Sequence, residues 1–318
     1  MDGNGKAGLP MTLTLYYHET SLAHDTGAEH PENIRRMEAL RALFGEEPYK
    51  NLPRGAVQKA AEEQILRAHP YTYLQKLQKA VPQSGYALLD ADTILSPASL
   101  DAAFYAAGAA CAAVDDVMEG KTRRAFCAVR PPGHHAEPER AMGFCLFNNI
   151  FIAARHAQEA HGTGKIAIVD FDVHHGNGTD AMTRRHDGSI FFISSHQHPL
   201  WPMTGLEEDN EDCVMNLILP AASGSERFRT LYETKVFPAL NRFAPELVLI
   251  SAGFDAHRDD PLAQLALETE DFGWVTRELC AIADRHAQGR VISVLEGGYN
   301  IAALRESVAA HLDGLRPE

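Results

Sequence analysis

Residues 166–177 read IAIVDFDVHHGN, an apolar run that passes directly into acidic residues, histidines and a glycine. A short run rich in β-branched residues predicts a buried strand, and a polar segment with glycine predicts the loop after it. Three more predicted strands are followed at once by such a segment: RPPGHH (130–135), GFDAH (253–257) and EGGYN (296–300). Ligands of parallel α/β sheets bind beyond the carboxyl ends of the strands, so we expect these four segments to meet in one crevice.

Strand patterns alternate with helix patterns along the chain, which predicts an α/β fold with a mostly parallel sheet in a single domain. Strands are expected at 12–16, 125–129, 166–171, 190–194, 247–251 and 291–295, and helices at 97–118, 148–160, 226–242, 270–285 and 301–312. For the first of these helices, Ser96 is the expected N-cap and Gly120 lies beyond the end. The Gly-rich residues 1–10 are predicted to be a flexible tail before a domain spanning 11–318.

The composition is that of a globular protein with an acidic surface. The formal net charge of −14 argues against direct nucleic-acid binding, because neutralising phosphates requires clustered lysine and arginine. A cationic substrate would instead be attracted. The longest apolar run, residues 102–114, is too short to span a bilayer, so we expect no membrane partner. The five cysteines form no CxxC pair and no secretory signal precedes them, which predicts reduced thiols in the cytoplasm.

A divalent metal site is predicted at the end of the 166–171 strand. Alternate side chains of an extended chain share a face, so Asp170, Asp172 and His174 project together. Asp255, after the predicted strand 247–251, is the natural candidate for a further oxygen ligand. Asp172, His174 and Asp255 would leave one coordination position open, as in catalytic sites, and this mixed set suits zinc best and ferrous iron second. A DxH pair alone is more often a hydrogen-bonded pair at a strand end.

Two histidines and a tyrosine stand at the ends of other predicted strands. His134 and His135 follow a Pro-Pro-Gly segment that would hold both imidazoles in set positions, and histidine titrates near neutral pH. The pair is therefore a candidate acid and base. Tyr299 follows two glycines that would let its hydroxyl reach over the crevice. Taken singly, a histidine pair is more often an ordinary loop feature and Tyr299 could equally pack on the sheet edge; their shared position at strand ends favours catalysis.

Five motifs in this order resemble the zinc-dependent histone deacetylases, and most closely their class II and bacterial deacetylase-like branch. They are RPPGHH, GFCLFNN (143–149), DFDVHHGNGT (170–179), SAGFDAH (251–257) and LEGGYN (295–300), and the likeness covers nearly the whole chain from about Leu13. The resemblance implies the arginase/deacetylase fold, a single open sheet of about eight parallel strands between helices, with the catalytic domain over 11–318. It also implies hydrolysis of acetylated amines by one Zn²⁺ per chain on Asp172, His174 and Asp255.

The same resemblance implies roles for the surrounding polar residues. His134 and His135 would face the attacking water, Tyr299 would face the substrate carbonyl, and Asp170 would hydrogen-bond His134. Asn177 stands where some relatives carry the aspartate that orients the second histidine, so His135 should be less basic here. A structural K⁺ would lie among the following residues: Asp170, Asp172, His174, Ser194 and Ser195.

A narrow substrate channel is a further implication, with Gly143 and Phe144 on one side and Trp201 on the other. Leu262 stands where polyamine-deacetylating relatives carry an acidic residue, which favours acetyl-lysine in proteins or peptides as the substrate. An acetylpolyamine or another small acylated amine is the alternative. The family more often has phenylalanine at the position of Trp201, so the width of the channel and its preferred acyl group stay open.

Two other interpretations remain at this point. A binuclear manganese hydrolase of the arginase type would need further aspartates around a second ion, which the DFDVHH segment lacks. A catalytically silent module that only binds acylated lysine would keep the fold, although every proposed ligand and Tyr299 is present. The apolar residues around 200–203 would also suit an interface in a homo-oligomer.

Overall fold

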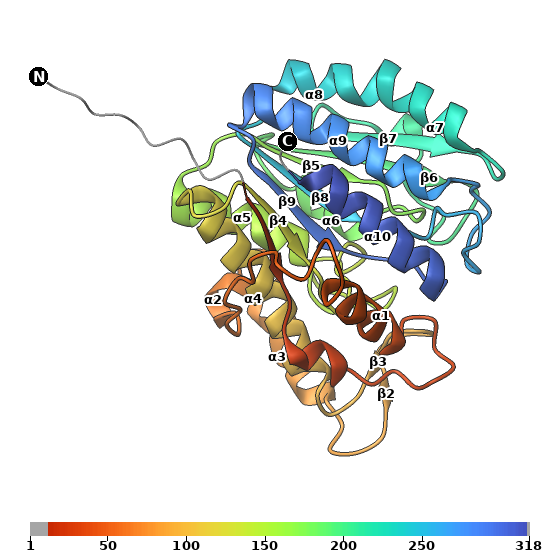
Figure 1. Cartoon of the computed structure of the whole chain (residues 1–318). Coiled ribbons are helices and arrows are strands. Elements are labelled where there is room, and N and C mark those ends of the chain that lie inside the picture. Colours follow the sequence, from red (N-terminus) through yellow and green to blue (C-terminus); the bar gives the residue numbers. More distant parts are fainter. Residues whose placement is uncertain (1–11, 317–318) are drawn as a thin grey trace, which may run out of the picture.

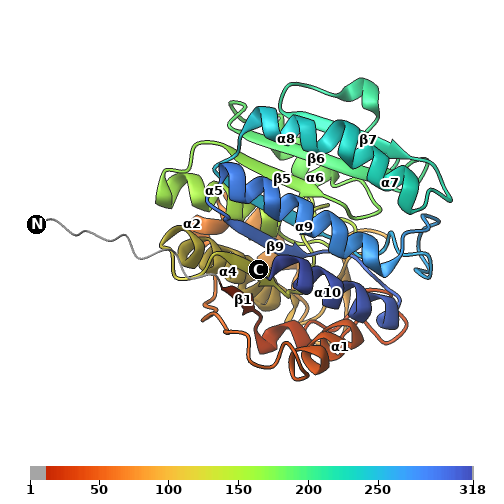
Figure 2. The ribbon, with the colours of Figure 1, turned by 45° about the horizontal axis from the view of Figure 1, so that its top comes forward.

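A single parallel sheet forms the centre of the molecule and lies between two layers of helices (Figures 1 and 2). The computed structural model describes residues 12–316, so the predicted tail at 1–10 lies outside the described residues. In spatial order the strands are β1 (Leu13–Tyr16), β4 (Arg124–Cys127), β9 (Val291–Leu295), β8 (Leu247–Ala252), β5 (Ile166–Asp170), β6 (Ile190–Gln197) and β7 (Val214–Leu219). All neighbouring pairs run parallel. The predicted open α/β sheet is confirmed, with seven strands rather than about eight.

The structure has a strand at each of the six predicted positions, and β7 is the addition. This strand lies at the edge of the sheet, and Met215 and Ile218 are partly exposed. Asn216 interrupts its apolar run, which weakened the strand pattern in the sequence. A short antiparallel pair, β2 (Ala87–Leu88) and β3 (Ile94–Leu95), lies outside the main sheet.

Successive side chains of each strand point to opposite faces of the sheet, which divides the core into two layers. On β5, Ile166 and Ile168 pack with α4 (Ser99–Met118), α5 (Asn149–His161) and α6 (Asn177–Thr183). Ala167 and Val169 face the opposite layer, which contains α1 (Arg35–Phe44), α7 (Ser225–Leu231), α8 (Phe237–Phe243), α9 (Thr269–His286) and α10 (Ile301–Leu315). Two further helices, α2 (Glu62–Ile65) and α3 (Tyr71–Ala80), pack with α4 and α5 in a third cluster. Since both faces are covered, the central strands are almost continuously apolar.

Several helix boundaries differ from the predicted ones by one to three residues, and two differences have a structural explanation. α4 begins at Ser99 and not at 97, because the Ser96 hydroxyl accepts from Asp25 N at 3.1 Å instead of capping the helix. The helix predicted at 226–242 is divided by a π-helical segment, η3 (Tyr232–Val236), between α7 and α8. The buried hydroxyl of Tyr232 lies 2.8 Å from Ser195 Oγ, so this segment reaches the end of β6. Two 3₁₀ turns complete the elements, η1 (Glu19–Leu22) and η2 (Glu207–Asp209).

The order of the strands explains why the polar segments meet. The four loops that carry them follow β4, β9, β8 and β5, which are consecutive in the sheet. Their carboxyl ends therefore form one continuous edge, and the register pairs Asp170 directly with Ser251 of β8. The crevice expected from the sequence lies at this edge.

Two properties of the described residues bear on the environment of the protein. All five cysteines are free thiols: Cys111, Cys127, Cys145, Cys213 and Cys280. Within residues 12–316, no helix has the length and apolar character needed to cross a membrane.

Candidate active site

Three acidic and imidazole side chains converge where the loops after β5 and β8 meet. His174 Nδ1 lies 3.1 Å from Asp172 Oδ1 and 3.1 Å from Asp255 Oδ2. The three potential ligand atoms lie within 4.8 Å of one another, and at most 8% of any of these residues is exposed. The fold thus brings together the three residues that were predicted to bind a metal.

Backbone groups and glycines hold these carboxylates in place. Val173 N donates to Asp255 Oδ1 and Gly297 N donates to Asp172 Oδ2, each at 2.9 Å. A Cβ atom at Gly253 would lie 1.9 Å from Asp172 Oδ2, and one at Gly297 would lie 2.2 Å from Asp255 Oδ2. A side chain at either glycine would fill the space beside the carboxylates, so these glycines keep room for the ligands.

The electrostatics of the cluster fit a divalent cation. Burial and the neighbouring Asp172 raise the pKa of Asp255 to about 7. Burial opposes a charge on His174, yet Asp172 and Asp255 raise its pKa to about 10. Two buried carboxylates therefore require a positive partner, and a metal ion can replace the proton on His174. One imidazole and two carboxylates are a ligand set that suits Zn²⁺.

His134 and His135 lie side by side next to these ligands, with ring centroids 3.9 Å apart. His134 Nδ1 is 2.9 Å from Asp170 Oδ2. Although burial opposes it, Asp170 and Asp172 raise the pKa of His134 well above its ordinary value. Burial and the nearby rings of His134 and His174 hold the pKa of His135 well below its ordinary value. His134 is therefore suited to stabilise negative charge and His135 to accept a proton.

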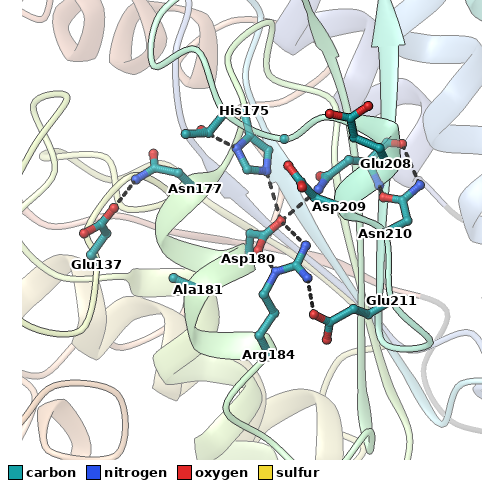
Figure 3. Close-up of a pocket in the computed structure, with 13 residues that line it drawn as sticks. Glu137, His175, Asn177, Asp180, Ala181, Arg184, Glu208, Asp209, Asn210 and Glu211 are labelled. Carbon is teal, nitrogen blue, oxygen red and sulfur yellow. Dashed lines mark hydrogen bonds and ion pairs between the residues drawn. The ribbon is translucent and has the colours of Figure 1, made fainter.

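Asn177 determines which nitrogen of His135 carries its proton. Asn177 Nδ2 donates to Glu137 Oε1 at 2.9 Å, and a carboxylate only accepts, so the amide oxygen faces His135 (Figure 3). This oxygen lies 2.8 Å from His135 Nδ1, which therefore donates to it. A proton on Nδ1 leaves Nε2 free to accept one from a reacting molecule. Glu137, to which the sequence analysis assigned no role, thus acts on His135 through Asn177.

Glu137 reaches Asn177 from a separate polar pocket of about 540 Å³. Charged residues dominate its wall, where Arg184 pairs with both Asp180 and Glu211 (Figure 3). Glu208 lies across this pocket from Glu137 (Figure 3). Replacing either Glu137 or Glu208 therefore removes one negative charge from the pocket. Only the replacement of Glu137 also removes a hydrogen bond to Asn177.

We expect Glu137→Ala to lower kcat by about tenfold with little change in KM, because the Asn177 amide loses the acceptor that fixes its orientation. Glu137→Gln should recover most of the rate, since its amide oxygen still accepts from Asn177. Glu208→Ala is the matched control and should leave kcat unchanged. Steady-state kinetics of the three variants test this; an equal loss in Glu137→Ala and Glu208→Ala would assign the effect to pocket charge and exclude the orienting role.

A cavity of about 390 Å³ opens to the surface from His174, one of the three candidate metal ligands. The four residues predicted to form a channel all line it, together with three residues predicted to be catalytic or to bind the metal: Gly143, Phe144, Trp201, Leu262, His135, His174 and Tyr299. The ring centroid of Phe144 lies 5.8 Å from that of Tyr299, and the centroid of Trp201 lies 4.7 Å from that of His135. Aromatic walls therefore extend down to the polar residues.

Gly143 allows the cavity wall to approach His135 closely. Its φ is +56°, and a Cβ there would lie 2.6 Å from both His135 Cδ2 and Trp201 Cη2. Phe144 follows with a φ of 69°, a conformation that is unusual for a residue with a side chain and is concentrated at functional sites. Thr93 Oγ1 holds this segment by accepting from Phe144 N at 3.1 Å.

A buried ion cluster anchors the loop that carries Tyr299. Arg36 Nε donates to Gly298 O at 2.7 Å, and its Nη2 donates to Glu296 O at 2.5 Å. Glu32 pairs with both Arg36 and Arg130, and none of the three is exposed. Arg130 begins the RPPGHH segment, so one carboxylate connects the histidine loop to the tyrosine loop.

The side chain of Glu296 supports the histidine loop directly. Its Oε2 accepts from Gly133 N at 2.7 Å and from His134 N at 3.1 Å. Burial raises the pKa of Glu296 to about 7. Glu32, Arg36 and Glu296 were not predicted as site residues from the sequence. For Glu296, the available signal was a charged residue inside an otherwise apolar and glycine-rich strand end.

Tyr299 lies partly exposed in the cavity wall, and Tyr299 N donates to Asp260 Oδ2 at 2.7 Å. Burial and the charge of Asp255 raise the pKa of its hydroxyl well above the ordinary range, so the oxygen keeps its proton at neutral pH. The hydroxyl is therefore available as a hydrogen-bond donor. The outer wall also includes residues without an assigned role in the sequence analysis: His30, Pro31, Ala91, Asp92, Ile94 and Leu200.

Three of the five residues predicted to surround a potassium ion lie at or just after the end of β5, and two lie within β6, but they do not all face one another. Ser194 pairs with Asp170 across the sheet, and its Oγ lies 3.0 Å from His196 Nδ1. Ser195 Oγ is bonded to the Tyr232 hydroxyl, and successive side chains of a strand point to opposite faces. A cation here would therefore draw on backbone oxygens as well as on side chains.

Among residues 12–316, only one other group of three ligand-type side chains is close enough to hold a metal ion: Asp115, His156 and His161. Two of these belong to α5 and one to α4, so they do not bracket a second ion beside Asp172. This arrangement disfavours the binuclear, arginase-type interpretation for the described part of the chain.

Comparisons with known proteins agree with this geometry. The histone deacetylase domain family matches residues 30–315. A histone deacetylase-like amidohydrolase of Pseudomonas aeruginosa is 39% identical over 281 residues, which cover 86% of this chain and 73% of that protein. A probable deacetylase of Archaeoglobus fulgidus is 34% identical and covers 92% of this chain and 82% of its own length. The crystal structure of the HDA15 HD domain matches with a TM-score of 0.88 and 31% identity over 96% of this chain and 89% of that one.

Proposed function

The chain belongs to the histone deacetylase family, hydrolases of acetylated amides, and we propose that it deacetylates lysine side chains with one Zn²⁺ on Asp172, His174 and Asp255. The observation that carries the proposal is the cavity of about 390 Å³. Its outer lining is mostly aromatic and aliphatic, with His30 and Asp92 as the polar exceptions, and His135, His174 and Tyr299 lie in the same wall. An acetylated lysine has the matching order of groups, four apolar methylenes and then an amide.

When bound, Zn²⁺ would supply Lewis-acid polarisation of the amide carbonyl and of the attacking water. The protein's own groups do the rest. His135, neutral and protonated on Nδ1, accepts the proton of the water through Nε2 and returns it to the amine as the C–N bond breaks. The Tyr299 hydroxyl donates to the carbonyl oxygen as negative charge develops there. His134, charged and held by Asp170, stabilises the same charge. Phe144 and Trp201 flank the lysine stem and exclude water from it.

Acetyl-lysine in proteins or peptides is the substrate that the cavity favours over an acetylpolyamine. A polyamine carries a second ammonium group, which a carboxylate at the position of Leu262 would bind; Leu262 presents an apolar side chain instead, and the carboxylate in the cavity lining is that of Asp92. Hydrolysis of an acetyl-lysine peptide, N-acetylputrescine and N-acetylspermidine, with and without a chelator, tests this choice. We expect the peptide to have the highest kcat/KM and the chelator to abolish turnover; a higher kcat/KM for acetylspermidine would reverse the assignment.

Leu262→Glu should raise kcat/KM for acetylspermidine relative to the acetyl-lysine peptide by about tenfold, which corresponds to about 1.4 kcal/mol of added ion pairing. Leu262→Gln has nearly the same size without the charge, so it is the matched control and should leave the ratio close to that of the wild type. If both variants change the ratio equally, the shape of the side chain and not its charge controls the choice.

Four further features belong to the proposal. A structural K⁺ would bind at Asp170, Asp172, His174, Ser194 and Ser195, where buried carboxylates favour a second cation. A reducing cytoplasmic location is supported by the free cysteines. The exposed apolar side chains of Trp201 and Met203 favour a homo-oligomer. The net charge of −14 favours cationic peptides over nucleic acids as partners.

A further inference from the structure

A second cluster of ligand-type side chains lies at the end of α5, away from the cavity. His156 Nε2 and His161 Nε2 each lie 2.7 Å from the same atom, Asp115 Oδ1, which comes from α4. The three potential ligand atoms are within 4.8 Å of one another. The side chain of His156 is 7% exposed, whereas those of His161 and Asp115 are 18% and 42% exposed. The group is therefore already assembled and can be reached from solvent.

This cluster is at the opposite edge of the sheet from the catalytic residues. α5 starts at Asn149, next to the catalytic loops, and ends at His161, shortly before β5 begins at Ile166. A helix that connects two parallel strands runs back from the carboxyl edge to the amino edge. α4 and α5 lie side by side on the same face of the sheet (Figures 1 and 2). An ion at their end would join the two helices without entering the cavity.

We propose that Asp115, His156 and His161 bind a divalent transition-metal ion, for which Zn²⁺ is the probe, and that this ion is structural and not catalytic. Two imidazole nitrogens and one carboxylate oxygen form a ligand set that zinc accepts, with water completing the coordination. Zn–N and Zn–O bonds of about 2.0–2.1 Å place tetrahedral ligand atoms about 3.3 Å apart. Each imidazole nitrogen already lies 2.7 Å from Asp115 Oδ1, so a small outward shift of the three side chains makes room for the ion.

Arg67 is the residue that competes with the ion. Its guanidinium donates to His156 Nδ1, and its Nε lies 3.0 Å from Glu159 Oε2. When Nε2 of a histidine binds a metal, the ring proton resides on Nδ1, which can then no longer accept from a guanidinium. Arg67 must therefore leave His156, and Glu159 remains as its partner. Removing Arg67 should consequently tighten metal binding, which a purely structural hydrogen-bond cluster would not predict.

The test counts zinc ions in the 318-residue chain after its catalytic site has been filled. Titration against a chromophoric chelator should reveal one further equivalent of Zn²⁺ per chain in the wild type. His161→Ala and Asp115→Asn should each weaken this site by about 100-fold, and Arg67→Ala should tighten it about threefold or more. His286→Ala is the matched control, because His286 also ends a helix, α9, and is also partly buried. It should keep the further equivalent.

Thermal unfolding gives a second readout that does not depend on activity. With the catalytic site already filled, further Zn²⁺ should raise the melting temperature of the wild type and of His286→Ala, but not that of His161→Ala, because an ion that binds only the folded state stabilises it. Deacetylase activity should be the same in all these variants. The proposal is overturned if the wild type takes up no zinc beyond the catalytic equivalent, or if His161→Ala retains the additional ion.

Discussion

Tyr299→Phe is expected to lower kcat on an acetyl-lysine peptide by about 10²–10³-fold, the usual effect of losing one donor to a developing oxyanion. The substitution removes a single oxygen and leaves the ring, which packs at 5.8 Å from Phe144 and at 5.2 Å from the guanidinium of Arg36. KM should change little, because the hydroxyl acts mainly on the transition state. The measurement is steady-state kinetics on the metal-loaded enzyme.

Tyr86→Phe is the matched control for this change. The Tyr86 hydroxyl donates to Asp25 Oδ2 at 2.9 Å, and the side chain is exposed outside the residues that line the cavity. Both variants should melt at the wild-type temperature, and Tyr86→Phe should keep the full rate. If Tyr299→Phe keeps the wild-type kcat, the hydroxyl has no role in the mechanism. The assignment of the metal ligands would stand after that result.

Asp255→Asn is expected to reduce both the zinc content and the activity of the enzyme, with a loss in kcat/KM of about 10³-fold or more. Asparagine has nearly the same volume and keeps an oxygen that can accept from Val173 N, so the backbone should hold its position. The substitution replaces a negatively charged ligand by a neutral, weaker one. Zinc content after dialysis at fixed free metal, measured alongside the rate, tests the assignment.

The stability of the same variant should change in a direction that depends on the metal. In the metal-free wild type, Asp172 and Asp255 repel each other while both are buried, so metal-free Asp255→Asn should melt at a higher temperature. Zn²⁺ should reverse this order, since it binds the wild type more tightly. Asp259→Asn, an exposed neighbour, is the control and should behave as the wild type does. The same zinc affinity and rate in Asp255→Asn would exclude Asp255 as a ligand.

The local sequence was sufficient for the sheet wherever strands are covered on both faces. β5 and β8 are continuous apolar runs because helices pack on both sides, and each run ends in a polar segment with glycine. The edge strand β7 was not predicted, because Asn216 interrupts its apolar run and two side chains of the strand are partly exposed. The start of α4 was misplaced because Ser96 has a partner in Asp25, 71 residues earlier in the chain, which no local pattern reveals.

By itself, the sequence determined the alternation of strands and helices, and which polar residues follow the strands, since burial and periodicity act on neighbouring residues. The tertiary structure decided which of these side chains are held in place and by what. Glu137 acts on His135 through Asn177, Arg36 reaches Gly298 across 262 residues, and Glu296 holds the histidine loop across 163 residues. Such contacts depend on how the loops meet at one edge of the sheet, because a hydrogen bond requires its atoms to be close in space and not in the chain.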